Sequence, residues 1–152
     1  MVLVQTGLFQ TGGTGNVTFA GKIDSASQGG VSLGKSLTVL NSLGTTTIGN
    51  SVGSGTNSEL GTISLTSNAI VLGSAGVTNI LLNTNASGGQ TYNGPISLNS
   101  NTAMNNGNSG SVVIASTLNS GSLSNKSLTI SNTQGVNVNG RVGAVNPLSA
   151  LN

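Results

Sequence analysis

The chain of 152 residues contains no cysteine, no histidine and no tryptophan, and it carries very few charges. Without histidine and cysteine, a serine nucleophile has no histidine base, and the usual zinc-binding clusters cannot form. Only two acidic residues are present, whereas a calcium site uses several carboxylates. The composition therefore argues against an enzyme, and we assign no catalytic residue, no metal ligand and no cofactor.

The few charges are also scattered, which argues against two further classes of partner. Nucleic-acid binding requires several cations that converge on phosphates, often beside aromatic platforms. No apolar run approaches the length of about 18 residues that spans a bilayer. We therefore expect no nucleic acid and no membrane span. The charged residues are Lys22, Asp24, Lys35, Glu59, Lys126 and Arg141, and they sum to a formal charge of +2.

The residues that are abundant indicate short β-strands. Val, Ile and Leu occur in brief alternating runs, and clusters of Gly, Asn and Ser separate these runs as turn residues do. No segment shows a helical period, so an all-β fold is predicted. The expected strands are 2–5, 17–23, 36–40, 45–48, 61–65, 69–72, 79–82, 95–98, 111–115, 127–130 and 136–142.

The spacing of these runs favours a solenoid over a sandwich. From Ile63 through Ile80, Ile96 and Val112 to Leu128, the strand centres recur at about 16 or 17 residues. Sandwich strands recur at about 8–12 residues, whereas one turn of a β-helix holds two or three strands. We therefore predict one parallel β-helix over 1–152, with coils of about 16–26 residues and seven or eight coils in total.

A longer repeat overlies this spacing. The segment 35–44, KSLTVLNSLG, returns as KSLTISNTQG at 126–135, and GNVTFA at 15–20 parallels GSVVIA at 110–115. The second copy ends before its pattern is complete. This suggests an excerpt from a longer array of repeats.

Four phrases carry a resemblance to a known family: GNVTFAG at 15–21, GGQTYNGPISL at 88–98, NTAM at 101–104 and RVGAVNPLSAL at 141–151. They resemble the degenerate repeats of filamentous-haemagglutinin-like, large repetitive bacterial surface adhesins. The resemblance implies a secreted, right-handed parallel β-helix at the bacterial cell surface, used for adhesion. It also implies adjoining repeats and host-cell or matrix glycans as partners. The chain departs from the family in being very short and in having no recognisable secretion domain.

An alternative is a filament subunit that stacks end to end. Solenoids need polar caps to stay separate from one another, and neither end of this sequence has a charged edge or an amphipathic capping helix. A non-closing contact between the two ends would produce a fibre. The residues predicted to make this contact are Val2, Leu3, Val4, Val145, Leu148 and Leu151.

Three narrower functions have weaker support. Asp24 and Glu59 would form a glycosidase-like pair if the fold brought them together, but solvated loop positions are the simpler interpretation. The phrase Thr45-Thr-Thr-Ile48 suits an ice-binding face, yet it occurs once. Tyr92 would stack on a sugar if it were exposed, although packing on its neighbours at a corner is favoured.

Overall fold

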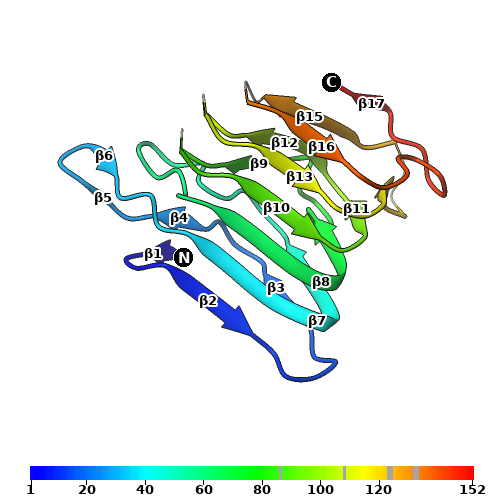
Figure 1. The fold of residues 1–152 in the computed structure, drawn as a ribbon, viewed down its shortest axis with the longest axis horizontal. Coiled ribbons are helices and arrows are strands. Elements are labelled where there is room, and N and C mark those ends of the chain that lie inside the picture. The colour runs from blue at the N-terminus through cyan, green and yellow to red at the C-terminus, as the bar shows by residue number, and fades with distance from the viewer. Residues whose placement is uncertain (86, 108, 123–124, 132–133) are drawn as a thin grey trace.

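A computed structural model describes residues 1–85, 87–107, 109–122, 125–131 and 134–152. These residues form strands and no helix, and nearly all the strands pair in parallel. The chain winds into a β-solenoid of about six turns, with its two termini at opposite ends of the stack (Figure 1). The predicted all-β, parallel solenoid is confirmed, although it has fewer turns than the seven or eight expected.

Each turn contributes to three faces, which we call the first, second and third face in chain order. The first face holds β2 (Gly7–Gln10), the first half of β7 (Leu37–Ile48), the first half of β8 (Ile63–Leu72), β10 (Gln90–Asn93), β13 (Val112–Ile114) and β16 (Val136–Val138). The second face holds β3 (Val17–Phe19), the second halves of β7 and β8, β11 (Ile96–Leu98) and β14 (Leu118–Ser120). The third face holds β1 (Val2–Leu3), β4 (Asp24–Ser25), β9 (Asn79–Asn83), β12 (Asn101–Asn105), β15 (Ser127–Ser131) and β17 (Ala150–Leu151), joined through single bridges at Ile23, Val52 and Leu82.

The contacts between adjacent coils correct the expected coil length. The interval from one coil to the next is 22 residues between Asn79 and Asn101, and 26 residues between Ser36 and Thr62. It reaches 30 residues from Thr11 to its hydrogen-bond partner in the next coil. The shorter spacing seen in the sequence is therefore less than one coil, because each of its steps moves to a strand on a different face.

The pairing register shows that the longer sequence repeat is not a structural repeat. Segment 35–44 enters the first face through Leu37, whereas Ser127–Ser131 of the second segment form β15 on the third face, where Leu128 pairs with Thr102. Positions 132 and 133 of the second segment lie outside the described residues. Similar sequences therefore occupy different faces, because the interval between them is not a whole number of coils.

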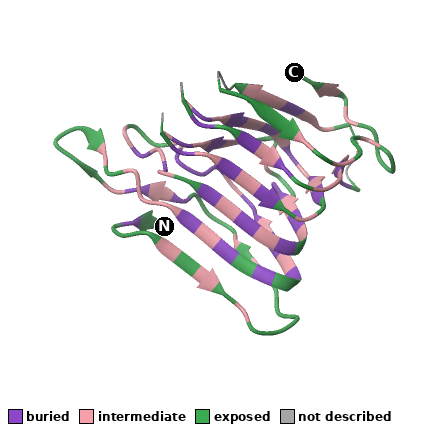
Figure 2. Ribbon diagram, in the orientation of Figure 1, coloured by how far each residue is buried: buried purple, intermediate pink, exposed green. Residues whose placement is uncertain are grey.

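Alternation of side chains along each strand builds the core. In β7, Leu37 and Val39 are fully buried, whereas Thr38 between them is only half-buried and points outward. Stacking then places Ile63 and Leu65 of the next coil above Leu37 and Val39. Figure 2 shows buried and half-buried bands alternating along β7 and β8. Burial of each such side chain contributes about 1.5–3 kcal/mol, so the aliphatic interior stabilises the stack.

A column of glycines marks the corner between the third and first faces. A Cβ atom on Gly61, Gly88 or Gly110 would overlap the backbone carbonyl of the glycine one coil earlier, which is Gly34, Gly61 or Gly88 respectively. Only glycine allows this close approach of successive coils. The column therefore fixes where each coil turns onto the first face.

One hairpin departs from the parallel winding. Strands β5 (Ser27–Gln28) and β6 (Val31–Ser32) pair antiparallel and project from the stack (Figure 1). Gly29 and Gly30 between them both have positive φ angles, of 59° and 77°, as a two-residue hairpin turn requires. The hairpin is an insertion at the corner and leaves the coil register intact.

Candidate functional site

Tyr92 lies in the core and not at a corner. It is the only tyrosine, it is fully buried in β10, and its position stacks between Leu65 and Ile114. Its hydroxyl donates a hydrogen bond of 2.7 Å to Oε1 of Gln90, and burial raises the pKa of the Tyr92 hydroxyl above its ordinary value. A buried ring cannot stack on a sugar, so Tyr92 packs on its neighbours as favoured, although it does so in the core and not at a corner.

The Asp24 carboxylate organises a loop. Its Oδ1 atom accepts hydrogen bonds from the backbone N–H groups of Ser54 and Gly55 at 3.0 and 3.2 Å, and from the Ser58 hydroxyl at 3.1 Å. Glu59 follows this loop, but its side chain makes no hydrogen bond within the described part of the chain. Three donors on one oxygen atom are the arrangement of a structural acceptor, so Asp24 is a strand residue bonded to the loop at 54–58 and not the solvated loop position that was expected.

The threonine phrase at 45–48 does not form a flat outer surface. Thr46 points inward and is fully buried, where its hydroxyl accepts a 2.6 Å hydrogen bond from Ser67. Thr47 points outward from the second face, opposite Val71 of the next coil. Neighbouring residues on one strand face opposite sides of the sheet, so Thr45 and Thr47 share the outward side while Thr46 turns inward, and the next coil places Ala69 and Val71 opposite the two outward threonines.

The six residues predicted to make end contacts lie in the first and last coils, with different exposures. Val2 and Val4 are 60% and 74% exposed in the first coil, and Val145 is 78% exposed in the last coil. Leu151 is also exposed, and Leu148 packs partly against the core. Leu3 is 6% exposed and belongs to the core, so its side chain is not available for an end contact.

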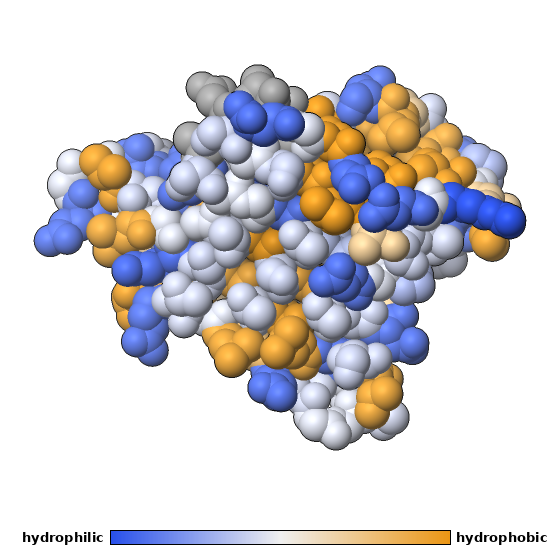
Figure 3. Space-filling model, viewed as in Figure 1, coloured by the Kyte–Doolittle hydropathy of each residue, from blue (hydrophilic) through white to orange (hydrophobic). Residues whose placement is uncertain are grey.

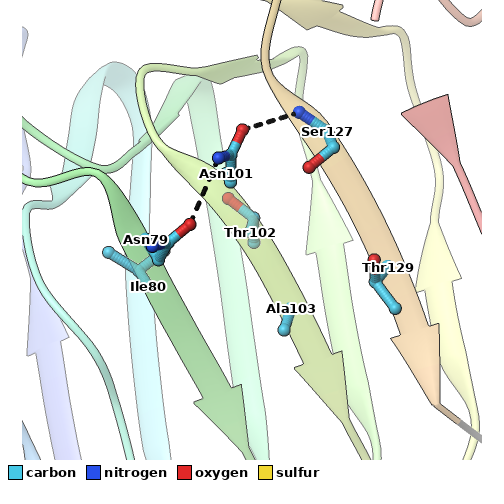
Figure 4. A pocket seen from close by; sticks show the side chains of 7 residues that line it. All are labelled: Asn79, Ile80, Asn101, Thr102, Ala103, Ser127 and Thr129. Carbon is cyan, nitrogen blue, oxygen red and sulfur yellow. Dashed lines mark hydrogen bonds between the residues drawn. The ribbon is translucent and has the colours of Figure 1, made fainter. Parts of the chain in front are cut away.

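A polar ladder on the third face was not predicted. Asn79, Asn101 and Ser127 occupy the same register position at the start of β9, β12 and β15. Nδ2 of Asn101 donates to Oδ1 of Asn79 at 3.1 Å, and the backbone N–H of Ser127 donates to Oδ1 of Asn101 at 3.1 Å. The central amide is therefore fixed from both sides (Figure 4).

A shallow hollow of about 190 Å³ lies beside this ladder. Asn79 and Ile80 line one side, Ser127 and Thr129 line the other, and Thr102 and Ala103 lie between them (Figure 4). Ala103 occupies the outward position between Leu81 and Thr129. The hollow follows from that arrangement, because Ala103 fills less space than the residues paired with it on either side.

The groups around the hollow are uncharged, and they combine polar side chains with the apolar Ile80 and Ala103. The amide nitrogen of Asn79 and the hydroxyls of Ser127 and Thr129 make no hydrogen bond within the described residues, so they remain able to bind a ligand. None of the lining residues titrates or carries charge. The arrangement suits recognition of neutral hydroxyl or amide groups and supplies no acid, base or nucleophile.

These ladder residues cannot be recognised in the sequence for a physical reason. Asn, Ser and Thr occur throughout the chain, and only the pairing register shows that Asn79, Asn101 and Ser127 stack. The one available signal is the interval from Asn79 to Asn101, which is 22 residues and equals one coil.

Within the described residues, no group of three or more acidic side chains is placed to hold a metal ion. The described chain also holds no helix that is long and apolar enough to cross a membrane. No protein family, curated protein or solved structure matches the sequence.

Proposed function

We propose that the chain is a non-catalytic structural segment of a bacterial surface or extracellular protein, of the adhesin-repeat type. Such a segment extends as a rod and presents its outer faces to partners. The stacking itself is the observation that carries this proposal. Leu37, Ile63 and Val112 are fully buried in the same column of the first face, so each coil completes the core of its neighbour as in repeat proteins.

Two further observations support a structural role. The Asp24 carboxylate is occupied by three donors from residues 54–58, and the buried Gln90 side chain donates to the backbone oxygens of Leu82 and Asn105 at 2.9 and 2.8 Å. These polar side chains bond backbone groups of the loop at 54–58 and of strands β9 and β12, which is a structural use of buried and partly buried polar groups.

Surface location is tested with antibodies against the purified chain. We expect them to label intact cells of the organism that makes the protein, while antibodies against a cytoplasmic protein label only permeabilised cells. Labelling that requires permeabilisation would contradict a surface role.

The non-catalytic assignment is tested with a panel of polysaccharides. Turnover of any polysaccharide by the purified chain that is lost in the Asp24→Ala variant would contradict this assignment.

End-to-end assembly is the second candidate, and the distribution of apolar surface favours it. All exposed large hydrophobic residues among the described residues lie before Thr45 or after Gly135. Figure 3 shows apolar patches beside the first coils and at the C-terminal end. The first-face edge strands, β2 and β16, run in the same direction as the strands they pair with. A second copy can therefore continue the parallel pairing at either end.

Electron microscopy and sedimentation of the purified chain test this candidate. Long unbranched filaments whose length grows with protein concentration are expected if copies stack. Monodisperse particles of one chain at all concentrations would exclude stacking and leave the structural role intact.

A further inference from the structure

We infer that the hollow beside Ala103 on the third face is a binding site for a neutral saccharide. This inference rests on the proposed adhesive function and names the class of ligand for it. It is drawn from three features of the hollow, which are its rigid ladder, its uncharged open groups and its central strand β12, which is paired on both sides.

The first feature is preorganisation. The Asn101 amide is held at both ends by hydrogen bonds of 3.1 Å, to Asn79 and from Ser127. Its strand β12 is paired with β9 on one side and with β15 on the other. The Asn79 amide, whose oxygen accepts from Asn101, is thereby held in place, so it loses little conformational entropy when its nitrogen binds a ligand.

The second feature is the chemistry of the open groups. The Asn79 amide nitrogen donates, and the hydroxyls of Ser127 and Thr129 both donate and accept. A saccharide hydroxyl also donates and accepts, so it can match such a set. The lining has no cation to bind a phosphate and no carboxylate to bind a metal ion.

The third feature argues against a peptide ligand. An extended peptide usually binds a sheet by adding a strand to an open edge. The hollow sits over β9, β12 and β15, and the central strand has no free edge. Side-chain groups that project from the face are the available contacts, and these favour a ring with hydroxyls over a peptide backbone.

Size and affinity follow from the same geometry. A volume of about 190 Å³ is smaller than the pockets of drug-sized ligands, which begin at about 300 Å³, and it suits a single sugar ring. No aromatic side chain lines the hollow to stack on the ring. We therefore expect a dissociation constant of about 1 mM for one site, with tighter binding when many copies are displayed together.

The experiment is a titration of the ¹⁵N-labelled chain with neutral sugars, followed by amide chemical shifts. The probes are glucose, galactose, N-acetylglucosamine and lactose. Glucuronic acid serves as a charged sugar for comparison, and a short neutral peptide represents the alternative type of ligand. We expect saturable shifts at Asn101, Ala103 and Thr129 with at least one neutral sugar. Absence of saturable shifts with all four at about 100 mM, some hundredfold above the expected constant, would overturn the inference.

Two matched variants locate the site. Ala103→Leu fills the hollow and should weaken binding at least tenfold. Ser97→Leu makes a similar change on the outward side of β11, on the second face of the same coil, and should leave binding unchanged. Equal effects of the two variants would overturn the assignment of the site, as would binding of glucuronic acid or the peptide alone. Because the titration uses the purified chain, its outcome is independent of whether the protein reaches the cell surface.

Discussion

The Tyr92 hydroxyl and the Gln90 side chain form a hydrogen-bonded pair inside an otherwise aliphatic stretch of the solenoid core. The donor is the phenol, the acceptor is Oε1 of Gln90, and the distance is 2.7 Å. Both residues are fully buried. The amide nitrogen of Gln90 continues the network to the backbone oxygens of Leu82 and Asn105, so the pair ties the first face of one coil to the third faces of two coils.

Removing the phenol hydroxyl is expected to destabilise the chain. Tyr92→Phe keeps the ring but leaves Oε1 of Gln90 buried without a donor, which costs about 1–3 kcal/mol. For a chain of this size, each kcal/mol lowers the Tm by about 2–4 °C. Urea unfolding followed by circular dichroism measures the change. An unchanged free energy of unfolding would show that water replaces the hydroxyl.

Alkaline pH should weaken the fold through the same residue. Burial raises the pKa of Tyr92 in the folded chain, whereas an unfolded tyrosine titrates near pH 10. The stabilisation is fully present below pH 10. Above it, the unfolded chain releases a proton that the folded chain keeps, so the free energy of unfolding falls by about 1.4 kcal/mol per pH unit.

The control for this pH dependence is Tyr92→Phe, which removes the only tyrosine. The stabilities of the two proteins, measured by urea unfolding between pH 8 and pH 12, should converge as the pH rises. Parallel curves would contradict the assignment. Tyrosinate absorbance should appear together with unfolding and not before it.

The corner glycines give the largest expected effect of a single methyl group. Gly88→Ala places a Cβ atom on the carbonyl oxygen of Gly61, so adjacent coils must separate. We expect a loss of at least about 3 kcal/mol, or failure to fold. Gly12→Ala is the matched control, because a Cβ atom at Gly12 meets nothing within 4 Å. Its effect on urea unfolding should stay within about 0.5 kcal/mol.

These glycines also show how far the sequence could predict the coil. Gly34, Gly61, Gly88 and Gly110 lie one coil apart and precede the first buried residue on the first face. The spacing of these glycines therefore equals the length of one coil. The spacing of aliphatic residues is easier to see in the sequence. Because aliphatic residues line all three faces, however, that spacing runs from a strand on one face to a strand on another and is shorter than one coil.

Strand positions were predicted well where aliphatic residues alternate, and poorly elsewhere. The runs 36–40 and 45–48 are the two halves of β7. By contrast, β10, with the sequence Gln-Thr-Tyr-Asn, and β12, which begins and ends with Asn, were missed. Both strands lack an alternating aliphatic run and contain Asn, which is depleted in strands, and they form because the coils on either side supply hydrogen-bond partners. That information lies in the stacking and not in the local sequence.

The Asp24 carboxylate is expected to hold the loop at 54–58 in place. Asp24→Ala removes an acceptor from Ser54, Gly55 and Ser58. We expect a loss of about 1–2 kcal/mol, at the lower end of the range for charged hydrogen bonds because Asp24 is partly exposed. Hydrogen exchange should speed up most at Ser54 and Gly55. Glu59→Ala is the control, and equal exchange in the two variants would contradict this role.

Charge placed over the open end of the last coil should prevent stacking if the chain assembles end to end. Val136 lies in the inward column of the first face, above the fully buried Val112, and is 47% exposed. Asn137 is the next residue of the same strand and points outward. Val136→Lys introduces a cation that a second copy would have to desolvate, whereas Asn137→Lys keeps the same charge away from the end surface.

We expect Val136→Lys to reduce the sedimenting fraction at least tenfold at equal concentration, and Asn137→Lys to change it little. If both variants lower the sedimenting fraction equally, net charge and not the end contact controls assembly. If neither variant lowers it, this end of the stack does not form the contact.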